Sequence, residues 1–332
     1  MSDDAAMRAH QAMGPGNEFD MVRLMMAQWG PLAVDIGDDA AVLRALSREI
    51  VATGRELVVS TDACVEGTHF LRGWLTPHEI GARAVAAALS DLAAMGARAD
   101  AVLFAFVLPD LWRASLVDIA DGIAQVVRPT GAKIVGGNLS QGRTFSLTTT
   151  VIGSTLHAVS RRGAQPGDRL LVTGSLGGPG QAVAALYAGH EPAAWARGRF
   201  ASPVPRLREG MALALAGVHA MLDISDGLAA DARHLAAASG VRLRIDAACI
   251  PIGPQVDVVA ALQSGEEYEL LIAASATVAT QLCARWREQF DVSLTDVGEV
   301  VGVQTDGALE IVGLPDPDVR VEFIVGHDHF TE

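Results

Sequence analysis

The spacing of apolar and polar positions predicts that helices and strands alternate along the chain. Apolar residues at helical intervals indicate a helix over 17–30, and Gly30 is expected to end it. The apolar run at 56–60 is typical of a buried strand, which leads through Thr61 and is expected to end at Asp62. Further elements of the first half are expected as strands over 101–108, 133–135 and 145–153 and as a helix over 113–127.

One helix start carries a specific sequence signal. Thr76, Pro77 and Glu79 form a capping box with proline at the first helical position. The helix that they open is expected to continue through an alanine-rich stretch to about Met95, with Gly96 as its C-terminal cap.

The second half shows the same alternation after the turn-rich segment 161–168, which we take as the boundary between two halves. Elements are expected as strands over 169–173, 220–223, 241–245 and 269–273 and as helices from Gly180 and over 206–216, 226–239 and 277–289. Interleaved strands and helices in both halves predict an α/β or α+β fold. We expect two domains, residues 1–155 and 156–332.

The acidic composition excludes some classes of partner. The chain has 332 residues, with 39 Asp and Glu against 25 Lys and Arg, and its net charge of −14 argues against nucleic-acid binding. Its apolar stretches are too short to span a bilayer, and its first residues lack the features of a signal peptide. Cys64, Cys249 and Cys283 are widely spaced, which favours reduced thiols over a disulfide or zinc site. We therefore expect a cytoplasmic protein with no membrane partner.

Four motifs place aspartates where the pattern favours apolar or neutral residues. Asp91 is the most unusual, because it lies inside an alanine-rich helical stretch where Ser90 is the polar neighbour. The others lie beside predicted strands or at a strand-to-helix junction: Asp38, Asp39, Asp62, Asp223 and Asp226. For any one motif, a turn residue or a helix N-cap is the more common explanation.

Taken together, the four motifs favour a magnesium site. A buried carboxylate without a partner is costly or takes up a proton, and these segments contain no Lys or Arg to balance it. Magnesium prefers carboxylate oxygens and completes its shell with water and substrate phosphates. Ser60, Thr61 and Ser225 could add hydroxyl or carbonyl oxygens. Cations held in this way would make an acidic surface a receptor for polyphosphate.

Other candidate residues carry weaker signals. The Gly-Gly-Asn triplet at 136–138 follows a short predicted strand, where N–H groups could approach a phosphate, although this triplet is also common in turns. The glycine-rich segment 173–180 lacks the Lys-Ser/Thr ending of a P-loop, so we interpret it as a turn. Arg161 is well placed for a phosphate or belongs to a solvated turn, and His69 is a substrate contact or a structural histidine.

The acidic segment before the last predicted strand has two interpretations. Glu266, Glu267 and Glu269 lie in the sequence Ser-Gly-Glu-Glu-Tyr-Glu-Leu. They could face a substrate, but an exposed polar loop is the simpler expectation.

In their order along the chain, these motifs resemble the thiamine-monophosphate kinase family, in a superfamily with aminoimidazole ribonucleotide synthetase and selenophosphate synthetase. The matching stretches are GDDAAV at 37–42, STDACVEGTHF at 60–70, LSDLAAMGA at 89–97, GGN at 136–138, RRGAQPGD at 161–168, DISDGLAAD at 223–231, GEEYEL at 265–270 and GHDHF at 326–330. They cover the chain nearly from end to end, and the STD, LSDLAAMGA and DISDGL motifs together form a specific set.

The resemblance implies a kinase that phosphorylates thiamine monophosphate with ATP and several Mg²⁺ ions. It implies a homodimer in which the N-terminal ATP-binding and Mg-binding domains pack through their sheets, followed by a C-terminal α/β domain. By position, the implied metal ligands are Asp39, Ser60, Thr61, Asp62, Asp91, Asp223 and Asp226, of which Asp39, Asp62, Asp91 and Asp226 are taken as catalytic. The implied ATP contacts are Gly137, Asn138, Arg161 and Ser225, and the implied substrate positions are His69, Glu266 and Ile324.

Three positions depart from the family pattern. Asn138 stands where some members have a metal-binding Asp, and Ile324 stands where relatives have a Trp that stacks on the substrate. The acidic segment begins Ser-Gly-Glu-Glu-Tyr, where the family has Gly-Gly-Glu-Asp-Tyr.

Two alternatives to this kinase remain. One is another synthetase of the superfamily, of the aminoimidazole ribonucleotide synthetase type. A selenophosphate synthetase would be expected to have a reactive Cys in an N-terminal Gly-rich segment, and a hydrogenase-maturation relative would be expected to end in Cys. This chain has Cys64 as its first cysteine and ends in His-Phe-Thr-Glu. The other alternative, from a different class, is a nucleotide-binding or metal-binding protein without catalysis.

Overall fold

The computed structural model describes residues 24–33, 52–304 and 308–315, and these form two compact units. The first unit comprises Met1–Leu92 with Arg98–Leu156, and the second comprises Ala93–Ala97 with His157–Glu332. Within the described ranges, none of the helices combines the length and apolar character needed to cross a membrane.

The first unit is built on a four-stranded sheet. Its strands are β1 (Glu56–Val65), β4 (Ser146–Thr155), β2 (Arg98–Leu108) and β3 (Lys133–Gln141), in that order across the sheet. β4 is antiparallel to both β1 and β2, whereas β2 and β3 are parallel. The parallel connection from β2 to β3 contains a helix, as such crossovers usually do.

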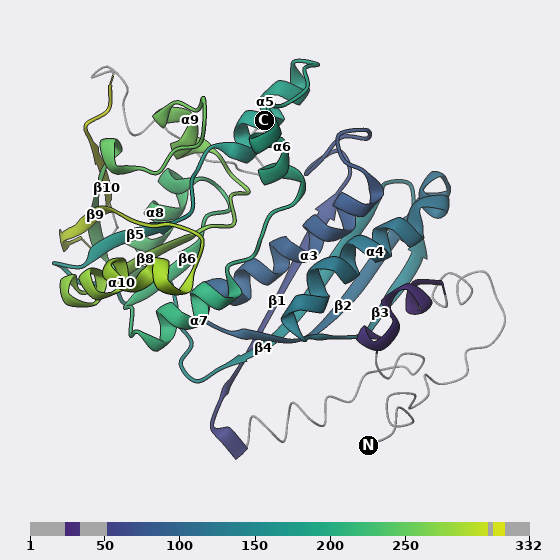
Figure 1. The fold of residues 1–332 in the computed structure, drawn as a ribbon, viewed down its shortest axis with the longest axis horizontal. Helices are drawn as coiled ribbons and strands as arrows, with labels where there is room; N and C mark the ends of the chain where they lie inside the picture. Colours follow the sequence, from purple (N-terminus) through teal and green to yellow (C-terminus); the bar gives the residue numbers. More distant parts are fainter. Residues whose placement is uncertain (1–23, 34–51, 305–307, 316–332) are drawn as a thin grey trace. The chain divides into compact units, whose positions relative to one another are not determined.

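Two helices, α3 (Pro77–Ala94) and α4 (Leu116–Val127), cover one face of this sheet (Figure 1). The predicted capping box opens α3, because Thr76 N–H donates to Glu79 Oε2 at 2.8 Å and Glu79 N–H donates to Thr76 Oγ1 at 3.3 Å. The helices approach closely because Gly81 faces the Ile119 carbonyl and Gly122 faces the His78 carbonyl, where a Cβ would overlap backbone atoms. Short 3₁₀ turns complete the unit: η2 (Gly30–Leu32), η3 (Asp110–Ser115) and η4 (Arg128–Thr130).

Two strands of this unit are longer than the sequence predicted. β1 continues past Asp62 to Val65, so Asp62 lies inside the strand opposite Thr149. β3 continues past 135, so the Gly-Gly-Asn triplet is part of a strand and does not form a turn. In both cases, pairing with a neighbouring strand outweighs local signals that are typical of strand ends. Gly137 is required there, because a Cβ would overlap the Phe104 carbonyl.

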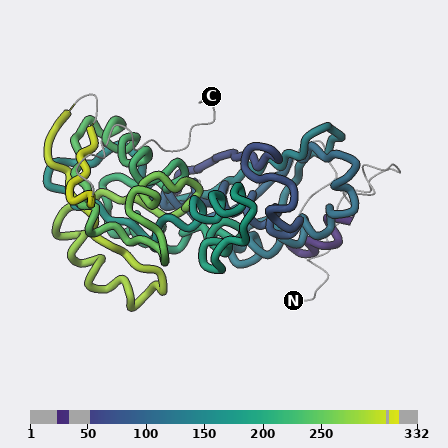
Figure 2. The backbone as a smooth tube through the Cα atoms, turned by 90° about the horizontal axis from the view of Figure 1, so that it is seen from above, coloured from purple at the N-terminus to yellow at the C-terminus, as the bar shows by residue number. Residues whose placement is uncertain are grey.

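The second unit is built on a six-stranded sheet. The order across it is β10 (Ala308–Val312), β7 (Val241–Asp246), β9 (Leu294–Val303), β5 (Arg169–Thr173), β8 (Leu270–Ala274) and β6 (Ala220–Asp223). β10, yellow in Figure 2, is parallel to its neighbour β7, and the other pairs are antiparallel. The sequence patterns predicted β5 to β8 but not β9 and β10, whose alternation of apolar and polar residues is weak.

Helices pack on the sheet of the second unit. α8 (Leu228–Ser239) lies in the main core together with residues from all six strands, and α10 (Ala276–Gln289) contacts β5 and β9. The remaining helices are α5 (Gly178–Tyr187), α6 (Ala194–Ala201), α7 (Leu207–Leu215), α9 (Val258–Gln263) and the 3₁₀ turn η5 (Ala247–Cys249). α6 and α9 were not predicted, because they are short. The long predicted helices agree with the structure to within two residues at each end, except that α4 begins at Leu116 and not at Arg113, because residues 110–115 form η3.

Candidate functional site

The first unit brings together three of the predicted metal ligands on the helix-covered face of its sheet. Ser60 and Asp62 lie two and four residues after the buried Val58 and therefore share its face of the strand, the side of the sheet where α3 lies. Ser60 Oγ donates a short hydrogen bond of 2.5 Å to Asp91 Oδ2 on α3. A strand and a helix thus present carboxylates to one place.

Two other predicted residues of this unit lie on the opposite face of the same sheet. Thr61 alternates with Ser60, and its hydroxyl lies 3.1 Å from Thr150 Oγ1. Asn138 alternates with the buried Leu139 and is exposed. Their side chains therefore do not join Ser60 and Asp91. Gly137 is exposed in β3.

The predicted substrate residue His69 lies in a tight loop after β1. Val65 N–H donates to His69 Nδ1 at 3.1 Å, so a neutral imidazole carries its proton on Nε2. The loop packs against aromatic side chains, because Phe70 is buried and its ring centroid lies 6.3 Å from that of Trp112. Trp112 Nε1–H in turn donates to Glu66 Oε2 at 2.8 Å. The fold thus fixes His69 as a hydrogen-bond donor at Nε2.

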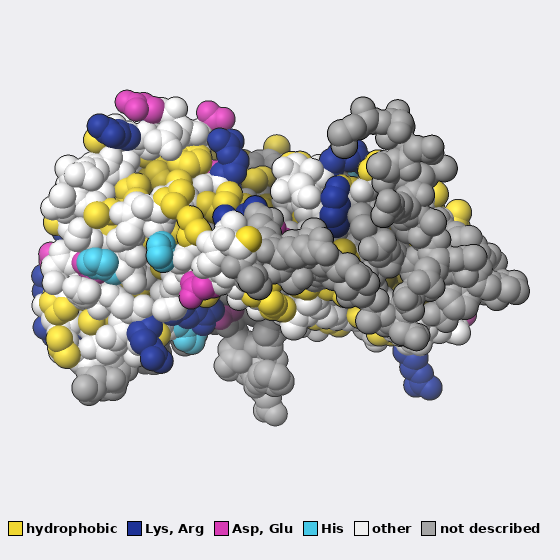
Figure 3. Space-filling model, turned by 90° about the horizontal axis from the view of Figure 1, so that it is seen from below, with side chains coloured by type: hydrophobic (Ala, Val, Ile, Leu, Met, Phe, Trp, Pro, Cys, Tyr) yellow, Lys and Arg dark blue, Asp and Glu magenta, His cyan; other side chains and the backbone are white. Residues whose placement is uncertain are grey.

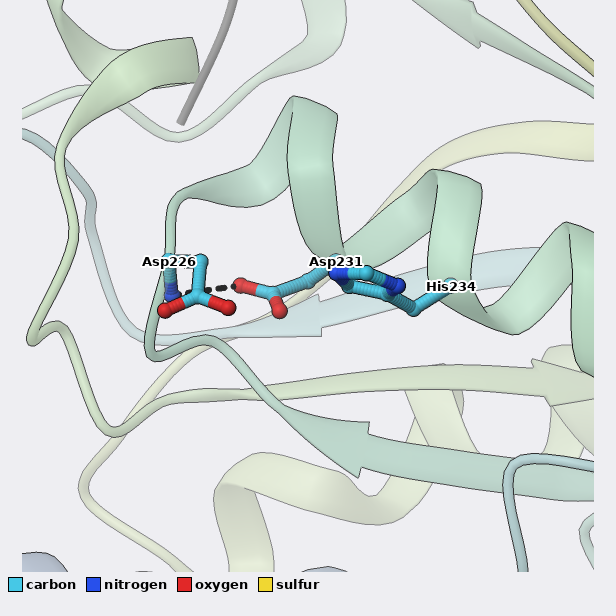
Figure 4. A group of neighbouring side chains, drawn as sticks. All are labelled: Asp226, Asp231 and His234. Carbon is cyan, nitrogen blue, oxygen red and sulfur yellow. Dashed lines mark hydrogen bonds between the residues drawn. The ribbon is translucent and has the colours of Figure 1, made fainter. Parts of the chain in front are cut away.

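The second unit places Asp223 at the end of β6 and Asp226 in the loop before α8. A third aspartate, Asp231 on α8, organises this loop (Figure 4). Its Oδ2 accepts the backbone N–H groups of Ser225, Asp226 and Gly227 at 3.0, 3.0 and 3.1 Å. The sequence analysis gave Asp231 no role. Its place in the first turn of α8, four residues after Gly227, is the signal that its carboxylate could accept N–H groups at the start of this helix.

The charge environment of this loop is acidic. Burial, with a smaller contribution from the charges of Asp226 and Asp223, raises the pKa of Asp231 to about 8, against the lowering effect of the hydrogen bond from Asp226 N–H and of the charge of Arg161. Arg161 therefore lies near enough to interact with the acidic loop. Its segment is fixed in place, because Ser239 Oγ on α8 donates to the Arg161 carbonyl at 2.9 Å.

A histidine on α8 that the sequence analysis did not select lies beside this loop. Asp226, Asp231 and His234 each offer a ligand atom, and these atoms lie within 4.8 Å of one another (Figure 4). Asp231 and His234 are three residues apart on α8 and therefore share a face of the helix. His234 is exposed, whereas Asp231 already accepts three N–H groups through one oxygen. Asp226 is thus the more available carboxylate.

The predicted substrate residue Glu266 lies beside this loop. Glu266 N–H donates to the Ser225 carbonyl at 2.6 Å, and Tyr268 N–H donates to the Ile224 carbonyl at 2.9 Å. Glu266 and Tyr268 have left-handed backbones, with φ of 60° and 53°. The structure therefore places Glu266, Ser225 and Asp226 next to one another, as their assignment to one site requires.

The expectation that Glu266, Glu267 and Glu269 form an exposed polar loop is wrong for two of these three glutamates. Glu267 and Glu269 are buried. Glu269 accepts hydrogen bonds from Arg206 at 2.5 and 2.7 Å and from Thr173 Oγ1 at 2.7 Å. Arg199 on α6 and Arg206 at the start of α7 are the arginines that pair with these glutamates. Both are distant in the sequence, so local composition could not reveal them.

In the glycine-rich segment 173–180, residues 174–177 form the expected turn between β5 and α5, and α5 begins at Gly178. The segment lies against these buried carboxylates. Gly177 N–H donates to Glu267 Oε1 at 2.5 Å. A Cβ at Gly174 would overlap the carboxylate of Glu269. Carboxylates thus occupy the place that a phosphate would take in a phosphate-binding loop.

Figure 3 shows apolar side chains gathered on the surface of the second unit. One groove there lies between α7 and α10, lined among others by Ala212, Ala216, Val278, Leu282, Trp286 and Phe290. Gln281, Arg285 and Gln289 also line it, and none of the predicted site residues that the structure describes does. Two predicted site residues, Asp39 and Ile324, lie outside the described residues, as does Asp38.

Comparison with known proteins divides the chain into two domains that correspond closely to the two units. Residues 37–155 match the model of the AIR synthase related protein N-terminal domain, and residues 165–309 match that of the C-terminal domain. Thiamine-monophosphate kinase of Mycobacterium tuberculosis is 39% identical over 239 residues, 70% of each chain. This chain belongs to the thiamine-monophosphate kinase family.

Solved structures of thiamine-monophosphate kinases share the fold. The crystal structure of the enzyme from Stenotrophomonas maltophilia K279a has 30% identity and a TM-score of 0.76, covering 93% of this chain and 99% of that one. A structure described as AaThiL complexed with AMPPCP and TMP has 25% identity and a TM-score of 0.68, covering 90% of this chain and 95% of that one. The likeness thus extends over both units.

Proposed function

We propose that this chain transfers the γ-phosphoryl group of ATP to the phosphate of thiamine monophosphate, which yields ADP and thiamine diphosphate. The observation that carries the proposal is the pair of acidic centres, Asp62 with Asp91 and Asp223 with Asp226, in a chain of the thiamine-monophosphate kinase family. A relative's complex with AMPPCP, an analogue of ATP, and TMP supports the same pair of substrates.

The chemistry asks little of a general base. The acceptor is a phosphate oxygen that is anionic at neutral pH, so it attacks the γ-phosphorus without losing a proton first. The new P–O bond forms as the bond between the γ-phosphorus and the bridging oxygen breaks, and ADP leaves with the electron pair. Catalysis by the protein is then alignment and stabilisation of negative charge.

The acidic residues fit magnesium as the counter-ion. Asp62, Asp91, Asp223 and Asp226 offer the hard oxygen ligands that Mg²⁺ prefers, and Ser60 orients Asp91 by its hydrogen bond. Bound Mg²⁺ would neutralise the phosphate charges that this acidic protein otherwise repels. We infer the presence of several ions, with Asp39, Ser60 and the Thr61 carbonyl as further ligands.

Basic and neutral groups would bind the two substrates. Arg161, beside the acidic loop, would contact an ATP phosphate, with Ser225, Gly137 and Asn138 as further ATP contacts. His69 would donate from Nε2 to thiamine monophosphate, and Glu266 would accept from the same substrate, with Ile324 near its ring. With ATP as co-substrate, we place the enzyme in the cytoplasm.

We also infer that the chain forms a homodimer through the face of the first sheet opposite α3 and α4, which we call its open face. This face exposes apolar side chains, with Leu57 53% and Val59 57% exposed. Both lie on β1 and alternate with residues that face the helices. An apolar sheet face of this kind is typical of a surface that a partner covers.

The test is release of ADP in a coupled assay with ATP and Mg²⁺. Thiamine monophosphate, thiamine and the substrate of aminoimidazole ribonucleotide synthetase are added separately. We expect turnover with thiamine monophosphate alone, and its loss when EDTA removes the metal. Turnover with the aminoimidazole-pathway substrate would identify the alternative synthetase, and ATP binding without turnover on any acceptor would identify a non-catalytic binding protein.

A further inference from the structure

A buried polar network joins the segment around Glu266 to the start of α5. Ser264 is 4% exposed and Glu267 is 1% exposed. The Ser264 hydroxyl accepts from Gly180 N–H at 3.0 Å and donates to Glu267 Oε1 at 2.6 Å. Gly177 N–H donates to the same carboxylate oxygen. One hydroxyl and one carboxylate thus satisfy N–H groups at the N-terminus of α5, which have no partners within the helix.

The same glutamate lies at the centre of a strained backbone. The residues on either side, Glu266 and Tyr268, have φ of 60° and 53°, a region that non-glycine residues adopt at a cost. Such a conformation persists where surrounding contacts hold it. Here Arg199 donates to the Glu267 carbonyl at 2.9 Å, and its guanidinium lies 3.4 Å from the Glu267 carboxylate. Glu267 is therefore the fixed point of the segment.

The strained segment determines where the Glu266 side chain emerges. The acidic loop beside it has an independent support, because Asp231 holds the N–H groups of Ser225, Asp226 and Gly227. A shift of the backbone at Glu267 would therefore reorient the Glu266 side chain more than it would move the loop before α8, which Asp231 holds.

Ser264 and Glu267 lie on either side of Glu266 in the sequence, and the structure brings them into direct contact. We propose that Ser264 and Glu267 are a matched pair of positioning residues, which hold Glu266 in the orientation that accepts a hydrogen bond from thiamine monophosphate. The proposal rests on the proposed function, since Glu266 is taken there as a contact of thiamine monophosphate. The two residues are matched because one supplies the donor and the other the acceptor of a single buried hydrogen bond.

The test is a double-mutant cycle of Ser264→Gly, Glu267→Asp and their combination. In Glu267→Asp, the shorter side chain leaves the buried Ser264 hydroxyl without its acceptor, and in Ser264→Gly the carboxylate loses one of its donors and keeps Gly177 N–H and Arg199. We expect each single variant to raise the KM for thiamine monophosphate at least tenfold, with the KM for ATP changed less than threefold. We expect the double variant to raise this KM no more than the worse single variant, because the hydrogen bond between the two side chains can be lost only once.

Matched substitutions elsewhere serve as controls. Ser275→Gly removes a serine that caps α10, and Glu310→Asp shortens a glutamate that pairs with Arg244. Both should leave the two KM values within twofold of wild type. Additive effects in the cycle, equal changes in both KM values, or reduced stability with unchanged KM would each overturn the proposal.

A second measurement separates failure of this proposal from failure of the proposed function. Urea unfolding of the same four proteins gives the coupling between Ser264 and Glu267 without any turnover. If the wild type does not phosphorylate thiamine monophosphate, the function is wrong, whereas the matched pair stands or falls on this coupling. If the wild type is active but unfolding shows no coupling, the pair is refuted while the function remains.

Discussion

At the scale of single residues, Asp91 and Asp226 provide the most direct check of the proposed metal ligands. Replacing either by Asn removes one negative charge but keeps an oxygen, so the hydrogen bond from Ser60 to residue 91 can still form. We expect Asp91→Asn and Asp226→Asn each to lower kcat about 100-fold or more in steady-state assays.

Circular dichroism should show that these two variants remain folded. Asp118→Asn is a suitable control, because this aspartate is exposed on α4, and its kcat should match the wild-type value. Near-normal turnover in Asp91→Asn or Asp226→Asn would refute that ligand.

Glu267 should make the stability of the fold depend on pH. Burial raises its pKa to about 7, against the lowering effects of Arg199, Ser264 and the Gly177 N–H. Its ordinary value is 4.5. At pH values between 4.5 and about 7, Glu267 keeps its proton in the folded chain but has lost it in the unfolded chain. This contribution to the free energy of unfolding is therefore complete below pH 4.5 and is lost as the pH rises through about 7.

We therefore expect the free energy of unfolding to fall as the pH rises from about 5 to about 8, measured by urea titration at fixed ionic strength. Glu267→Gln, which cannot titrate, should make this slope shallower, and Asp231, whose pKa burial raises to about 8, should account for a slope that remains. Glu310→Gln removes a partly exposed glutamate and should leave the slope as it is. An equal slope in Glu267→Gln and wild type would contradict the assignment.

At the scale of elements, the position of Asp91 depends on how closely α3 and α4 approach. Gly122 on α4 lies against the His78 carbonyl, where a Cβ would overlap the backbone. Gly122→Ala should therefore separate the helices and lower the free energy of unfolding by about 2–3 kcal/mol. Because α3 carries Asp91, kcat should fall as well.

Gly198→Ala provides the opposite expectation on another helix. Gly198 lies in α6 with open space around its Cα, so alanine should stabilise the fold by about 0.5–1 kcal/mol. The two variants are compared by thermal and urea unfolding. If Gly122→Ala were as harmless as Gly198→Ala, the close contact of the two helices would not be a constraint.

The elements that the sequence predicted well are those with strong local signals. The capping box at Thr76 and Glu79 fixes the start of α3, and the apolar residues 170–172 indicate β5. β1 and β3 were predicted too short, because Asp62 and the Gly-Gly-Asn triplet are typical of strand ends. Their inclusion depends on pairing with β4 and β2, which local sequence does not reveal.

The candidate site was predictable where a residue type was out of place and hidden where its role depended on distant partners. Asp91 stood out in an apolar helix, and the structure places it against Ser60. Asp231 looked like an ordinary polar residue of a helix, although it holds three backbone N–H groups. Glu267 looked exposed, because Arg199, its partner, lies 68 residues away.

At the scale of the whole molecule, net charge and substrate charge have the same sign. The chain carries a net charge of −14, and ATP and thiamine monophosphate are both anions. Arg161 is one cation near the acidic loop, but it cannot balance Asp223, Asp226 and Asp231. The proposed Mg²⁺ ions would resolve this repulsion, which explains why chelation should abolish turnover and not merely weaken it.

The assembly of the molecule gives the last prediction. If two copies pack through the open face of the first sheet, a charge on that face must be buried or the dimer must separate. Val59 is 57% exposed in the middle of β1, so Val59→Lys should convert the dimer to a monomer in sedimentation-velocity experiments. Val303→Lys, at an apolar residue 76% exposed on β9 of the other unit, should leave the dimer intact. A monomeric wild type would refute the dimer, and a dimer that tolerates Val59→Lys would place its interface elsewhere.

Because the helix-covered face holds Asp62 and Asp91, we expect a folded Val59→Lys monomer to keep these carboxylates in place. Loss of its activity would then indicate that the dimer itself is required.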